Sequence, residues 1–198
     1  MRIFGEKMVD PLNNSRLQEF DNMFKIPIGI TVAHHEIHEG CSFVSDIVDE
    51  SMGDNDTLSL AFKTPNTTKR VHMIVETSLK GAGHIEIDEG GTWDVGSGTQ
   101  NPIYNRDRNS TEISTLLENT TSGPFIANNA VILNASSYGA GTIIHDFYVF
   151  GEKKLGGQLR DVEEIILKKN QTYMVIATAD AGTNGAQITL NWYEHVSV

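Results

Sequence analysis

The sequence predicts an all-β protein, a jelly-roll-like β-sandwich preceded by a short N-terminal arm. The clearest strand pattern lies near the C-terminus, where Ile188, Leu190 and Trp192 alternate with polar residues. This alternation is typical of a strand with one buried face, because successive side chains of a strand point to opposite faces of the sheet. Similar short runs recur between turn residues, and no long helical period follows Lys25. Several short strands separated by turn signals favour a sandwich or a barrel.

Most of the expected strands are short runs in which apolar residues recur at every second position. In chain order these runs span 28–32, 41–47, 58–62, 71–79, 85–87, 131–133, 142–150, 163–168, 172–178 and 187–194. Glycine and asparagine mark turns such as 81–83 and 169–171, because these residues tolerate the backbone angles of tight turns. Residues 112–118 fit either a strand or one helical turn. We therefore expect one sandwich domain over residues 26–198, after an arm over residues 1–25.

Composition narrows the classes of function. The 198 residues fit one domain, and their formal net charge is −11 at pH 7. We expect no binding of nucleic acid, since affinity for phosphates depends on clustered Lys and Arg. We also expect no membrane partner, because no apolar run is long enough to span a membrane. We expect synthesis in a cytosol, because the first residues lack the apolar core of a signal peptide. Cys41 is the single cysteine, so an internal disulfide is excluded.

Residues 1–25 differ from the rest of the chain. Their apolar residues recur at roughly helical spacing, which favours a short helix or an arm: Leu17, Phe20, Met23 and Phe24. Four basic residues balance four acidic ones, whereas an arm that binds nucleic acid is expected to be basic. A neutral arm with exposed aromatic residues suits docking on another protein. The same pattern also fits a terminal segment packed on its own domain.

Histidines and glutamates cluster in 34–39, but they do not form the zinc-protease pattern H-E-x-x-H, because Glu39 stands where the second histidine is required. If the stretch is a strand, His34, Glu36 and His38 share one face and could hold a transition metal. The alternative is a polar strand or rim loop, which we favour because no distant ligand completes the set. We therefore expect no metal ion and no cofactor. The acidic stretches 49–56 and 88–94 lack the residue order of a calcium loop.

The remaining chemistry does not indicate an enzyme. No G-x-S-x-G nucleophile motif is present, and Cys41 suits a buried apolar thiol better than a nucleophile. Arg106 and Arg108 lie in a polar loop, where they could pair with carboxylates of another subunit or form surface ion pairs of little energetic value. Trp93 and Trp192 could form a sugar-binding platform, although the position of Trp192 beside Leu190 favours the core.

Five stretches together resemble the head decoration, or cement, proteins of tailed bacteriophages. They are 34–40, 64–68, 104–110, 169–173 and 190–195, and the resemblance extends from about Thr31 to His195. It implies a virion protein on the outer capsid surface, usually a homotrimer, that clamps subunits of the major capsid protein. Such a protein is made in the cytoplasm of the bacterial host.

This resemblance, together with the absence of a catalytic motif in the sequence, predicts a non-enzymatic protein that stabilises a phage capsid. The residues expected to contact the capsid or a neighbouring subunit are Phe20, Met23, Phe24, Arg106 and Arg108. Two alternatives stay open. One is a tail-fibre or receptor-binding module that binds host glycans, and the other is a cupin-like, metal-dependent enzyme built on the 34–38 cluster.

Overall fold

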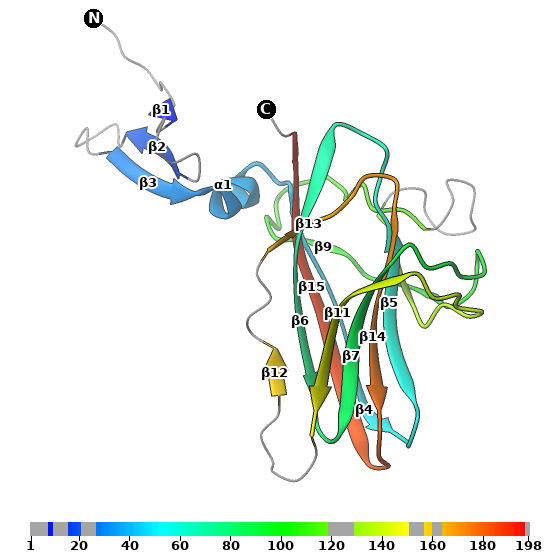
Figure 1. Cartoon of the computed structure of the whole chain (residues 1–198). Helices are drawn as coiled ribbons and strands as arrows, with labels where there is room; N and C mark the ends of the chain where they lie inside the picture. Colours follow the sequence, from blue (N-terminus) through cyan, green and yellow to red (C-terminus); the bar gives the residue numbers. More distant parts are fainter. Residues whose placement is uncertain are drawn as a thin grey trace, which may run out of the picture.

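A computed structural model describes the backbone of residues 8–9, 16–20, 27–118, 129–150, 157–159 and 164–196, and the side chains of 33–118, 129–150 and 164–196. Two antiparallel sheets pack face to face (Figure 1), which confirms the predicted all-β sandwich. In spatial order, the first sheet contains β11 (Thr142–Val149), β7 (Gly83–Glu89), β14 (Thr172–Ala179), β5 (Thr57–Lys63), β10 (Val131–Leu133) and β8 (Thr99–Asn101). The second contains β12 (Gly157–Leu159), β6 (Lys69–Leu79), β15 (Asn184–Val196), β4 (Ser42–Met52) and β9 (Tyr104–Asn105), with β13 (Ile165–Ile166) also paired to β6.

The core lies between the two sheets, and β15 crosses its centre. Ile188, Leu190 and Trp192 point inward from β15 and are at most 2% exposed, as their alternation predicts. The ring of Trp192 packs on Phe43, with 5.8 Å between the ring centroids. Tyr173 and other side chains of the opposite sheet complete the core. Trp192 is therefore a core residue.

A second, smaller cluster covers the outer face of the β5–β14 sheet. Met174 and Ile176 of β14 pack there with Ile132 of β10 and with Trp93, which comes from the segment after β7. Trp93 is 4% exposed. Because both tryptophans are buried, they cannot form the sugar-binding platform considered above.

A short helix, α1 (Val32–His38), replaces the strand or rim loop expected around the histidines. The amide of Gly40 donates to the carbonyl of Ile37 over 3.0 Å, and the amide of Cys41 donates to that of Glu36 over 2.9 Å. These two bonds form a Schellman C-cap, which needs a residue with positive φ, and Gly40 has a φ of 72°. Gly40 thus ends a helix.

The N-terminal segment forms strands where the apolar spacing suggested a helix. β1 (Met8–Val9), β2 (Arg16–Phe20) and β3 (Pro27–Thr31) make a small antiparallel sheet, which Figure 1 shows to one side of the sandwich. β3 ends at Thr31 and α1 begins at the next residue, so the helix joins the small sheet to the sandwich.

Residues 112–118 form neither a strand nor a helical turn. This stretch is an extended segment, apart from one β-bridge between Leu117 and Lys63, whose backbone amides and carbonyls bond in both directions over 2.7 and 2.8 Å.

Candidate functional site

The loop after β9 is fixed to the C-terminal end of α1. The side-chain amide of Asn105 donates to the carbonyl of Gly40 over 2.7 Å and to that of Glu112 over 3.1 Å. The backbone amide of Arg106 donates to the carbonyl of Ser42 over 2.8 Å. Helix α1 and residues 104–113 therefore form one continuous region, which we call the arm-end surface.

The arm-end surface has the side chains typical of protein interfaces. The guanidinium carbon of Arg108 lies 5.2 Å from the centroid of the Tyr104 ring, a cation–π contact. Tyr104 is 47% exposed, and Arg106 and Ile113 are also exposed. Tyrosine and arginine are the residue types in which binding energy concentrates at interfaces. An exposed Tyr–Arg pair held by its own loop is suited to contact another protein.

The structure allows only part of the predicted contact set to be placed. Arg106 and Arg108 are exposed and lie on the arm-end surface. Phe20 is the last residue of β2 and pairs with Pro27, at the end of the small sheet away from α1. Met23 and Phe24 lie outside the described residues. Helix α1 contacts β2, β3, β4 and β15, so it connects the small sheet to the sandwich.

The helical conformation separates the three residues of the strand-based metal hypothesis. His34 and His38 are one helical turn apart, with 2.9 Å between their Nε2 atoms, whereas Glu36 turns inward and is buried. His35 lies 3.6 Å from a carboxylate oxygen of Glu36 and 3.5 Å from one of Glu39. Within the described part of the chain, no three or more His, Cys, Asp and Glu side chains are arranged to hold a metal ion. The condition of the metal hypothesis, that this stretch is a strand, is therefore not met.

A polar cluster that the sequence patterns did not predict lies on the outer face of the β6–β15 pair, close to α1. Nδ1 of His72 donates to the Glu164 carboxylate over 2.7 Å, and the Tyr193 hydroxyl donates to the same oxygen over 2.8 Å. Nε2 of His195 lies 3.1 Å from Nε2 of His72. We call His72, Glu164, Tyr193 and His195 the His72–His195 cluster.

Burial changes the protonation behaviour of this cluster. Burial raises the pKa of Tyr193 above its usual value, and the negative charge of Glu164 raises it further. Burial also lowers the pKa of His195, against the opposing charge of Glu36. At neutral pH the cluster therefore favours a neutral tyrosine and a neutral His195. The alternation of β6 and β15 places His72 and His195 at outward positions, which was the available signal in the sequence. Nothing in the sequence indicates that these two residues, 123 positions apart, contact each other.

Cys41 follows the end of α1 and is half-buried, not buried as expected. Its thiol lies 3.8 Å from the carbonyl of Glu39. Burial raises the pKa of the thiol, and neighbouring carboxylates, among them Glu36, raise it further against the charge of Lys69. The protonated thiol is therefore favoured, which does not suit a nucleophile.

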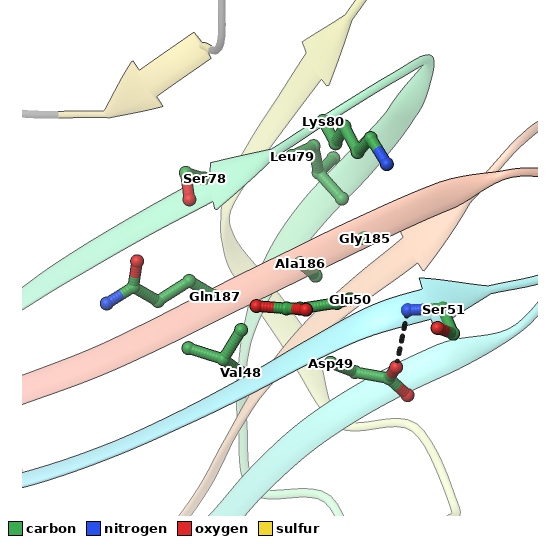
Figure 2. A pocket seen from close by; sticks show the side chains of 10 residues that line it. All are labelled: Val48, Asp49, Glu50, Ser51, Ser78, Leu79, Lys80, Gly185, Ala186 and Gln187. Carbon is green, nitrogen blue, oxygen red and sulfur yellow. Dashed lines mark hydrogen bonds between the residues drawn. The ribbon is translucent and has the colours of Figure 1, made fainter.

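Figure 2 shows a wide, open groove far from the arm-end surface. Its volume is about 520 Å³, and β4, β6 and β15 contribute most of its lining residues. Asp49, Glu50 and Lys80 are its charged side chains, and all three are exposed. Asp49 accepts a hydrogen bond from the amide of Ser51 over 2.9 Å, so it stabilises its own loop. The groove is wide open to solvent, and both polar and apolar side chains line it.

No family model, curated protein or solved structure matches this chain. The described helix is too short to cross a membrane.

Proposed function

We propose that this protein is a non-enzymatic virion component that binds the outer surface of a tailed-phage capsid, between subunits of the major capsid protein. The observation that supports the proposal most directly is the exposed Tyr104–Arg108 pair on the arm-end surface, next to the helix that leads to the small sheet. A rigid sandwich with an appended sheet at one end can contact two capsid subunits at once. The net charge of −11 suits the outside of a capsid better than its DNA-filled interior.

The strand order supports the finer assignment of a jelly roll. The order β12-β6-β15-β4 in one sheet lies opposite β11-β7-β14-β5 in the other. Strands that follow one another in the chain, such as β4, β5, β6 and β7, alternate between the two sheets, as two nested Greek keys require. Jelly rolls are frequent in viral capsid proteins.

We propose further that the protein assembles as a homotrimer. The support is β11, which lies at the edge of its sheet and exposes several large apolar side chains: Ile143, Ile144 and Tyr148. An exposed apolar edge strand invites aggregation unless a partner covers it. Closed assembly with copies of the same chain is a common way to cover such an edge.

The proposed mechanism is thermodynamic linkage. A ligand that binds the assembled shell but not its free subunits stabilises the shell by mass action, and the gain is about 2.7 kcal/mol when its concentration is 100 times its Kd. The protein therefore needs no catalytic group. Its contribution depends on affinity and on the number of copies bound.

The interface is tested by binding to empty capsids of the phage that encodes the chain. We expect Tyr104→Ala and Arg108→Ala to weaken co-sedimentation with capsids by at least tenfold each, since truncation of interface hot spots costs about 2 kcal/mol or more. Val48→Ala is the control, because Val48 is 50% exposed against 47% for Tyr104 and lies in the groove of Figure 2, away from both the arm-end surface and β11. Equal binding by all three variants would exclude the arm-end surface, and no binding by the native chain would reject the function.

The role of the arm is tested by deleting residues 1–24. We expect the truncated chain to keep its urea midpoint and to lose capsid occupancy, because the buried core side chains that the structure describes all come from residues 43–192. Equal occupancy of capsids by the truncated chain would reject the arm as an anchor.

A further inference from the structure

We propose that His72 and His195 form a binding site for a divalent transition-metal ion, with zinc as the reference ion, through their Nε2 atoms. These atoms lie 3.1 Å apart. Imidazole nitrogens bind zinc at about 2.0–2.1 Å, so two nitrogens on one ion lie roughly 3 Å apart. Imidazole also suits copper and nickel. The inference goes beyond the proposed capsid function and does not depend on it.

The backbone fixes this pair of side chains. β6 and β15 are hydrogen-bonded neighbours, with Tyr193 opposite His72 and Arg70 opposite His195. The two histidines are therefore diagonal neighbours on one face of the sheet, within reach of each other for long or aromatic side chains. Their rings meet edge to face, with 4.6 Å between the centroids. The backbone already holds both Nε2 atoms close together, and a bound ion takes the place of the hydrogen bond between them.

Glu164 prepares His72 as a ligand. Its carboxylate accepts the Nδ1 proton of His72 over 2.7 Å, so the Nε2 atom of His72 keeps its lone pair and accepts the hydrogen bond of His195 Nε2–H, which a bound ion would replace. Metal-binding histidines commonly donate their other ring N–H to a carboxylate in this way, which fixes the ring and increases its basicity. The Tyr193 hydroxyl holds the same carboxylate oxygen over 2.8 Å. His72 is 7% exposed, so its ring has little freedom to turn away.

The charges near the pair favour a cation. Glu164 contacts His72, and Glu36 on α1 lies close enough for its charge to act on His195 and Tyr193. The negative charges of both carboxylates attract a divalent ion at this position. Since no third side chain within the described residues is already placed as a ligand, water completes the coordination.

The full-length chain, stripped with a chelator, provides the test. Co²⁺ replaces zinc as a probe because its visible absorption reports its ligands, and Zn²⁺ is added separately while thermal unfolding is followed. We expect one Co²⁺ per chain and a higher midpoint temperature with Zn²⁺. His195→Gln should abolish both effects, and Glu164→Gln should weaken binding about 10- to 100-fold. His195 is partly exposed, so His195→Gln is expected to fold, and circular dichroism verifies this.

The histidines of α1 provide the control, because His34 and His38 also bring two Nε2 atoms together. The double variant His34→Ala/His38→Ala should keep both the Co²⁺ spectrum and the Zn²⁺ shift. The proposal is overturned if the native chain shows neither effect, if both persist in His195→Gln, or if both are lost in the double variant.

Discussion

The carboxylate of Glu194 accepts a hydrogen bond from the hydroxyl of Ser114 over 2.7 Å, and both residues are fully buried. The same carboxylate accepts from the amide and the hydroxyl of Thr115, over 3.0 and 2.5 Å, and from Nε1 of Trp192 over 3.1 Å. Hydrogen bonds to a charged acceptor are roughly twice as strong as neutral ones. One side chain of β15 thus fixes the segment that places Leu116 in the core.

We expect Glu194→Ala to lower the free energy of unfolding by about 3 kcal/mol, because it leaves several buried donors without an acceptor. Glu194→Gln keeps one carbonyl oxygen and should cost less. Urea unfolding measures both. The control is Glu50→Ala, because Glu50 is exposed and a surface substitution there should change stability by no more than about 0.5 kcal/mol. Equal costs for Glu194→Ala and Glu50→Ala would contradict the proposed importance of the buried carboxylate.

We expect Leu190→Ala to cost about 2–5 kcal/mol, since Leu190 is fully buried and its truncation leaves a cavity between the sheets. Gln187→Ala on the same strand is the matched control, because Gln187 points outward and is exposed. Its cost should be close to zero. The measurement is the urea midpoint at constant m-value. Similar losses for the two variants would mean that β15 does not bury the Ile188–Leu190–Trp192 face.

The sandwich could be predicted because its central strands have a local signal. β6 buries Val71, Met73 and Val75, which alternate in the sequence, and β15 shows the same period. β11 follows the pattern only in part, since a register shift between Ile143 and His145 interrupts the alternation. A bulge adds one residue to one strand, and alternation alone does not indicate where this happens.

The candidate site was less predictable for two physical reasons. The run around His34 has no strong period, and its one helix signal, Gly40 at the C-cap, is a common residue in turns as well. The His72–His195 cluster depends on strand register and on Glu164, which lies outside every named strand. Register is a property of the folded sheet, so single-sequence patterns do not bring such residues together.

We expect Gly98→Ala to destabilise the protein by more than about 1 kcal/mol. Gly98 has a φ of 71°, and a Cβ atom there would lie 2.4 Å from the carbonyl oxygen of Leu133. Gly182→Ala is the matched control, since a Cβ atom at Gly182 meets nothing within 4 Å and its φ is not positive. That change should be neutral or slightly stabilising, because it reduces the entropy of the unfolded chain. Thermal unfolding distinguishes the two, and a stable Gly98→Ala would show that the β10 end can move aside.

Glu89 should give the protein part of its stability against acid. Its carboxylate accepts hydrogen bonds from Nζ of Lys168 over 2.6 Å and from the hydroxyl of Tyr173 over 2.8 Å. Burial acts to raise the pKa of Glu89, but these two hydrogen bonds and the charge of Lys168 outweigh it, and the pKa falls below the usual 4.5. The folded state then binds the proton less readily than the unfolded chain. The stabilisation is complete above the unfolded pKa and is lost as the pH falls through the folded pKa.

Glu89→Gln tests this pH dependence, because glutamine resembles the protonated acid. We expect the variant to be less stable than the native chain at about pH 7 and to approach its stability as the pH falls to about 3. Urea unfolding over this range measures the difference. Glu50→Gln is the control, and we expect a difference near zero throughout, since Glu50 is exposed. A cost of Glu89→Gln that stays constant with pH would show that the ionised carboxylate is not the stabilising species.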